Sequence, residues 1–185
     1  MKKQFLLFCF LACSLLFLQS GNAQVFQYTY GSDGKIDLNH SWKFHAGDDP
    51  QWSAYNFDDS KWDTLNTEMN LKKMPRGKFT GIGWFRIHFR IDSALTAEKP
   101  LSLLIDQSGA SEIYVDGNKV AAFGKISTDA KDEIRSDPGG VPVLLNLVPG
   151  REHVIAIRYS NHEMDYGFTD NDLKRAGFSA LLVPA

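Results

Sequence analysis

Apolar and polar residues alternate in many short runs along this chain. In the clearest run, residues 83–91, the odd positions from Phe85 to Ile91 are apolar and the even positions from Trp84 to Arg90 are polar or amphipathic. A period of two residues with one apolar side is typical of a β-strand that is buried on one face. Further runs of this kind lie at 101–105, 113–115, 143–147 and 155–159. A last apolar run lies at 178–183, and weaker strand candidates lie at 25–30 and 42–45.

Turn-forming residues separate these runs. Asp116-Gly117 lies between the runs 113–115 and 119–123 and predicts a hairpin, because glycine accepts a positive φ. The polar, charged segment Ser127–Gly140 predicts a long exposed loop. No segment keeps a helical period, and the best helical turn is Pro50–Tyr55. Other turns are expected at Gly31–Gly34, Gly47–Pro50 and Pro149-Gly150.

Eight or nine short strands with this spacing predict an all-β fold, a two-sheet antiparallel β-sandwich or jelly roll. The apolar side of each run gives the expected core. It consists of Phe85, Ile87, Phe89, Leu103, Ile105, Val115 and Ile157.

The first 23 residues have the order of a secretory signal peptide. Lys2 and Lys3 precede an apolar run, Phe5–Leu18, and small residues follow up to Ala23. The apolar run has 14 residues, fewer than the roughly 20 that span a bilayer. We therefore expect cleavage after Ala23, one domain from 24 to 185, and a secreted or periplasmic location.

The alternative for the leader is a lipoprotein, with lipid attached at Cys13. Phe10 stands three positions before this cysteine, where an aliphatic residue is wanted, and the apolar run ahead of it is short. Cys9 and Cys13 are the only cysteines, so the mature chain would have no disulfide. Loss of Lys2 and Lys3 takes the net charge from -2 to -4, which gives no reason to expect nucleic acid as a partner.

Several segments, taken together, resemble one known family. They are 42–44 (WKF), 47–52 (GDDPQW), 57–62 (FDDSKW), 83–86 (GWFR), 106–117 (DQSGASEIYVDG) and 155–161 (IAIRYSN). In this order they resemble the N-terminal sugar-binding domain of family 2 glycoside hydrolases. Related domains serve as extracytoplasmic sensors in membrane signalling proteins. The resemblance implies a galactose-binding-like jelly roll over about Trp42–Val183.

The resemblance also implies that this chain is not itself an enzyme. The family places its two catalytic carboxylates in a separate barrel, which needs roughly 250 residues of its own. The sequence contains no G-x-S-x-G, no cysteine after residue 23 and no H-E-x-x-H. The leading hypothesis is an exported, non-catalytic carbohydrate-binding module. The alternatives are a sensor domain of a membrane protein or a detached hydrolase domain that packs on a catalytic partner.

Each candidate binding residue has a structural alternative. Trp84 and Arg86 share one strand face and suit a sugar or a carboxylate, but a covering N-terminal segment or an acidic neighbour would explain them equally well. The segment Trp42–Trp62 is rich in aromatic residues. We expect these large rings to hold the N-terminal segment onto the sandwich rather than to form a sugar-binding surface. Two polar loops complete the predicted site, with Asp106, Gln107, Ser108 and Glu112 in one and Asn161, His162 and Tyr166 in the other.

We expect these two loops and the Trp84/Arg86 face to converge on one rim that meets a carbohydrate. Arg86→Ala and Asp106→Ala would then weaken binding without unfolding the domain. No cofactor is expected. A structural calcium on Asp48-Asp49 or Asp170–Asp172 is the one metal considered, since the scattered histidines lack zinc spacing.

Overall fold

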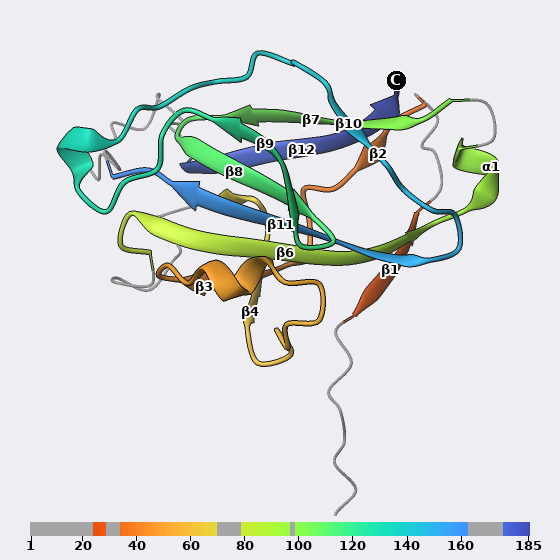
Figure 1. Cartoon of the computed structure of the whole chain (residues 1–185), viewed down its shortest axis with the longest axis horizontal. Helices are drawn as coiled ribbons and strands as arrows, with labels where there is room; N and C mark the ends of the chain where they lie inside the picture. Colours follow the sequence, from red (N-terminus) through yellow and green to blue (C-terminus); the bar gives the residue numbers. More distant parts are fainter. Residues whose placement is uncertain (1–23, 29–33, 70–78, 97–98, 163–175) are drawn as a thin grey trace, which may run out of the picture.

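The computed structural model describes residues 24–28, 34–69, 79–96, 99–162 and 176–185, which form a two-sheet β-sandwich (Figure 1). The predicted signal peptide, Tyr166 and the Asp170–Asp172 segment lie outside the described residues. No helix among the described residues is long and apolar enough to cross a membrane.

The first sheet has seven strands, in the order β4-β3-β6-β11-β8-β9, and β1 pairs with β6 beside β3. Pairing is antiparallel except between β1 and β6, which run parallel. Its strands are β1 (Val25–Tyr28), β3 (Trp42–Ala46), β4 (Asp63–Leu65), β6 (Ile82–Ile91), β8 (Ala110–Val115), β9 (Asn118–Phe123) and β11 (Glu152–Ser160).

The second sheet has five strands, in the order β10-β7-β12-β2, with β5 paired to β12. All of its pairs are antiparallel. Its strands are β2 (Ile36–Asp37), β5 (Glu68–Met69), β7 (Leu101–Gln107), β10 (Val143–Leu145) and β12 (Ala176–Pro184). Three short helices complete the described fold: η1 (Pro50–Ser53), α1 (Ser93–Thr96) and η2 (Ala130–Asp132).

The core between the sheets is built from the alternating residues that the sequence pattern selects. All seven predicted core residues belong to one buried cluster. Phe85 on the central strand β6 packs against the rings of Phe44, at 5.0 Å, and Phe178, at 5.1 Å. The predicted all-β sandwich and its core are therefore confirmed.

The hairpin between β8 and β9 is also confirmed. Asp116 and Gly117 both have positive φ, 50° and 85°, as this two-residue turn requires. The Asp116 carboxylate has a further role, because it accepts hydrogen bonds from the Val154 amide at 2.9 Å and contacts His153 Nδ1 at 2.7 Å. An aspartate at the turn thus ties the hairpin to β11.

Residues Asp48–Trp62, which we call the strap, lie across the outer face of the seven-stranded sheet (Figure 1). The strap contains η1, whose N-cap is the Asp49 side chain, so the predicted turn at Pro50 is confirmed. Trp62 packs on Trp84 and Ala156 of the sheet, with Trp52 and Phe57 partly buried around them. The predicted aromatic clamp is the arrangement found.

Candidate functional site

One end of the sandwich gathers the polar groups of several loops. β7 ends and β12 begins there, side by side at Gln107 and Phe178, and β8 begins where β11 ends, at Ala110 and Ser160. The loop after β9 projects beyond the same end (Figure 1). We call residues 107–109, 133–136 and 160–162 the rim.

Asn161 is the central side chain of the rim. Its Nδ2 donates to the Ser108 carbonyl at 3.2 Å and lies 3.2 Å from the Tyr159 hydroxyl. Its Oδ1 has no hydrogen-bond partner among the described residues, although Asn161 is only 5% exposed. An unsatisfied buried acceptor costs free energy, which a donor on a ligand or a water would recover.

Burial fixes the groups beneath Asn161. Tyr159 is fully buried, and burial is the main cause that raises the pKa of its phenol. The Tyr159 hydroxyl accepts a hydrogen bond from the Gly177 amide at 2.9 Å. The floor of the rim is therefore a neutral, tightly packed group rather than a titrating one.

Glu133 holds the projecting loop against β11. Its carboxylate accepts hydrogen bonds from the Ser160 hydroxyl and, at 3.0 Å, from the His162 amide. His162 Nε2 in turn contacts the Ser127 carbonyl at 2.7 Å, and the Ser136 amide donates to Gly109 at 2.9 Å. Sequence analysis did not find Glu133, because one acidic residue in a charged loop carries no distinguishing pattern.

Gly81 lets β6 approach the rim closely. It has a φ of +104°, and a Cβ there would lie 2.1 Å from His162 Nδ1. Its carbonyl accepts a hydrogen bond from the Asn161 amide at 2.9 Å. Only glycine fits both the backbone conformation and the contact with the imidazole.

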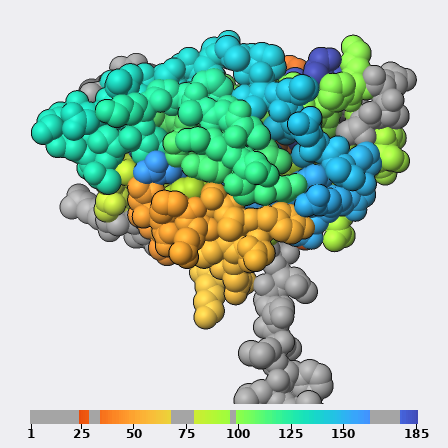
Figure 2. Space-filling model, in the orientation of Figure 1, coloured from red at the N-terminus to blue at the C-terminus, as the bar shows by residue number. Residues whose placement is uncertain are grey.

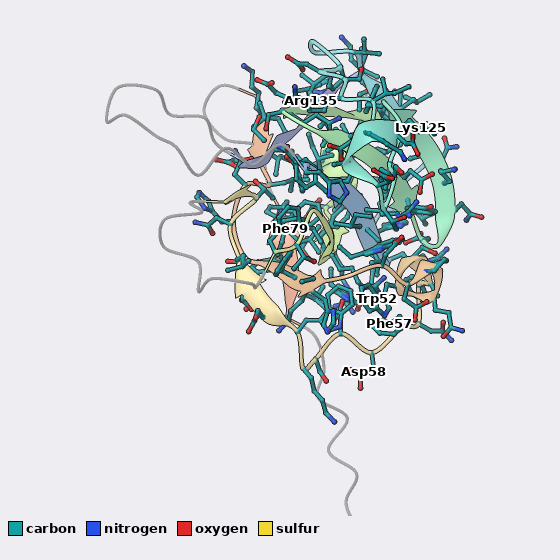
Figure 3. The ribbon with its side chains drawn as sticks, turned by 90° about the vertical axis from the view of Figure 1, so that its left-hand side faces the viewer. Trp52, Phe57, Asp58, Phe79, Lys125 and Arg135 are labelled. Carbon is teal, nitrogen blue, oxygen red and sulfur yellow. The ribbon has the colours of Figure 1, made fainter. Side chains whose placement is uncertain are left out.

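Figure 2 shows a recess on this side of the molecule, between the strap and the loop after β9. Atoms of β11 and β6 are visible at its floor. Figure 3 views the same end directly, with Trp52 and Phe57 of the strap on one side, Lys125 and Arg135 of the loop on the other, and Phe79 between them. Phe79 is buried and packs on Tyr159, with 6.0 Å between ring centroids, so it supports the rim from below.

Trp84 and Arg86 do not lie on an exposed face. Both are 0% exposed, because the strap covers them. The Trp84 indole donates to Asp48 at 3.2 Å, and Arg86 Nε donates to Asp59 at 2.7 Å. The sequence left open a ligand-binding role and a structural role for these two residues. The structure shows the covering segment and the acidic partner that the structural role requires.

The remaining predicted residues are divided between surfaces. Gln107 points into the interior, where its Nε2 donates to the Ser136 carbonyl at 2.7 Å. Glu112 lies away from the rim loops, where Arg158 at 3.0 Å and Lys119 at 2.9 Å pair with it. Asp106 is exposed and paired in register with Ser179 in the other sheet.

The predicted convergence of three segments is therefore corrected. Ser108, Asn161 and His162 do come together at the rim, but the Trp84/Arg86 face and Glu112 lie elsewhere. The strap covers Trp84 and Arg86, and Glu112 pairs in register with Arg158 on β11, whose guanidinium it contacts. Contact with a ligand remains a prediction for every one of these residues.

The described residues contain no group of three histidine, cysteine or acidic side chains that could hold a metal ion. Asp48 makes a two-point ion pair with Arg158, at 2.7 and 2.5 Å. Asp49 caps η1 through the Gln51 amide at 2.9 Å. The two acidic residues considered for calcium thus have other partners.

No family model matches the chain. Three of the individual proteins that resemble it are named as β-glucuronidases or family 2 glycoside hydrolases. A protein of Formosa agariphila named "Putative beta-glucuronidase" is 28% identical over 134 residues, covering 63% of this chain and 12% of that protein.

Solved structures extend the likeness to the fold. Beta-glucuronidase 2 of Bacteroides uniformis, bound to cyclophellitol-6-carboxylate aziridine, matches 80% of this chain with a TM-score of 0.58 and 20% identity. A glycosyl hydrolase family 2 member from Bacteroides cellulosilyticus matches 81% with a TM-score of 0.56 and 22% identity. This chain therefore has the fold of one part of family 2 glycoside hydrolases, as the sequence resemblance predicted. It spans only 17% and 20% of those two chains.

Proposed function

We propose that this chain is an exported, non-catalytic carbohydrate-binding module of the kind that family 2 glycoside hydrolases carry. The observation that carries the proposal is the match of 80% of the chain to a small part of a β-glucuronidase. The alternative within the same class is an accessory domain that packs against a hydrolase's catalytic domain. The coverage of 17% supports that alternative equally, so the experiment must separate the two.

The rim is the surface that supports ligand contact best. Sugar sites need a few polar groups held in fixed positions. Asn161 offers a side-chain carbonyl oxygen that has no partner within the described ranges, and the Ser108 hydroxyl lies 3.3 Å from its Nδ2. Arg86 Nη2 also lacks a partner among the described residues, but the strap covers Trp84 and Arg86 completely, so a ligand would have to displace the strap to reach them.

The acidic residues support a non-catalytic role. A glycosidase of this class needs a carboxylic acid whose pKa is raised, so that it can donate a proton. Burial raises the pKa of Asp59, but hydrogen bonds from His88 and Arg86 outweigh it and the net shift is downward. Burial also raises the pKa of Glu112, but its contacts with Lys119, Arg158 and Tyr114 outweigh burial and the net shift is downward.

Export is part of the proposal. The leader supports cleavage after Ala23, giving a secreted or periplasmic chain that begins at Gln24. Cys13 as a lipid anchor is the competing proposal, and the mass of the mature chain distinguishes them.

The test uses the mature wild-type protein on a glycan array that includes glucuronic-acid-terminated glycans, together with an aryl β-glucuronide as a hydrolysis probe. We expect retention of at least one glycan and no release of the aryl group. Release of the aryl group would contradict the non-catalytic role. Binding of no glycan at all would contradict the carbohydrate module and favour the accessory domain.

A further inference from the structure

Cleavage after Ala23 would make Gln24 the first residue of the mature chain. Gln24 is exposed and stands directly before β1, which begins at Val25. An N-terminal glutamine has a specific chemistry, because its α-amine and its side-chain amide can meet in an unstrained five-membered ring.

We propose that Gln24 is a modification site and that the mature chain carries pyroglutamate there. This inference rests on the proposed export and cleavage. The α-nitrogen attacks the side-chain carbonyl carbon Cδ, a C–N bond forms, and the bond from Cδ to the amide nitrogen breaks. The departing nitrogen takes up the protons and leaves as ammonia. The step needs no oxidant, reductant or other co-reactant.

The structure accommodates the ring. Pairing of β1 with β6 starts at Val25, opposite His88, so Gln24 lies just before the first pair of the ladder. Ring closure consumes the α-amine and the side-chain amide but leaves the Gln24 carbonyl in place. Exposure of the residue leaves room for closure by an enzyme or by the uncatalysed reaction.

The neighbouring residues keep this end of the chain in place. Phe26 and Tyr28 of β1 pack on the main core, and burial, with the nearby Asp37 carboxylate, raises the pKa of Tyr28 to about 12. A free α-amine, with a pKa of about 7.7–8.0, would place a positive charge one residue before this strand. The lactam removes that charge and the amine that aminopeptidases require.

The experiment is intact-mass analysis of the full-length chain, exported with its own leader and taken directly from the secreted fraction. We expect a chain that begins at Gln24 and is lighter by one ammonia. Treatment with pyroglutamate aminopeptidase should then expose Val25 to N-terminal sequencing. The Gln24→Ala variant is the matched control, since alanine has no side-chain amide and should keep a free amine.

Two results would overturn the inference. A mature chain that begins at Gln24 with a free amine would show that the ring does not form, while leaving the proposed export intact. A chain that begins at any other residue, including a lipid-modified Cys13, would overturn the cleavage and the modification together.

Discussion

Arg86 and Asp59 form an ion pair in which both side chains are fully buried. Arg86 Nη1 also donates to the Trp52 carbonyl at 2.5 Å, so one guanidinium ties two points of the strap to the sheet. Burial is the main cause that lowers the pKa of Arg86, opposed by its bonds to Asp59. These contacts give the arginine a structural role that its position in the sequence did not distinguish from ligand binding.

The Arg86→Ala substitution should therefore lower the free energy of unfolding. Removing the guanidinium leaves the buried Asp59 carboxylate with the contact to His88, and loss of one partner of a buried ion pair costs about 3–5 kcal/mol. Denaturant unfolding of wild type and variant measures the difference. Arg90→Ala is the control, because its guanidinium is half exposed and its contact with Glu152 is 3.4 Å. Equal stability of wild type and Arg86→Ala would contradict the buried pair.

His88 lies between two carboxylates. Its Nε2 is 2.9 Å from Asp59 and its Nδ1 is 3.1 Å from Glu152. Burial lowers the pKa of His88, but the hydrogen bonds and charges of Asp59 and Glu152 outweigh it and the net shift is upward. The folded state thus holds the imidazolium more firmly than the unfolded chain does.

Stability should consequently depend on pH through His88. Because its folded-state pKa is raised, the contribution is complete below about pH 6.5, the unfolded value, and is lost as the pH rises through the folded pKa. The difference in unfolding free energy between wild type and His88→Gln should therefore shrink as the pH rises through that range. A difference that grows with pH would contradict the assignment.

Phe89 tests the packing of the central strand. It is 0% exposed and belongs to the main core. Phe89→Ala should cost about 3–5 kcal/mol of unfolding free energy, through lost burial and a cavity. Chemical denaturation measures this, and a cost below roughly 1 kcal/mol would mean that the side chain is not buried as described.

At the scale of elements, Glu133 anchors the loop after β9 to the end of β11. Glu133→Ala should speed hydrogen exchange of the Lys125 and Ile134 amides, which bond to each other's carbonyls at 2.8 and 3.0 Å. Glu133→Gln keeps one acceptor oxygen and should retain most of the protection. Asp129→Ala, in the same loop, is the control, since the Asp129 side chain caps η2 and pairs with Lys131 of that helix. Unchanged exchange in Glu133→Ala would remove the proposed anchoring role.

The sequence predicted the strands that are long enough to show a period of two. β6, β7 and β11 follow the alternation, β12 contains the predicted apolar run 178–183, and the Asp116-Gly117 turn lies where the pattern predicts it. β2 and β5 have two residues each, too few for any period, and were not predicted.

The candidate site was harder to predict than the fold. Alternation tells which residues share a face, but both faces of β6 are covered, so the amphipathic side of Trp84 and Arg86 did not imply exposure. Glu133 and Ser160 are 27 residues apart, and only the folded loop brings them together. Asn161 was predicted because it follows a strand, and its contact with Ser108 confirms that the two loops meet.

At the scale of the whole molecule, the two surfaces have different roles. The strap covers the outer face of the seven-stranded sheet around Trp84 and Arg86 with aromatic rings and buried charges. We propose that a carbohydrate meets the rim rather than the strap.

The most direct test is a backbone-amide chemical-shift map of the mature protein, titrated with the tightest-binding glycan from the array. We expect the largest shifts at Ser108, Gly109, Asn161 and His162. These shifts should be lost in Asn161→Ala but not in Asn118→Ala, which changes an exposed asparagine at the β8–β9 turn. Shifts confined to Trp52 and Phe57 of the strap, with none at the rim, would contradict this expectation.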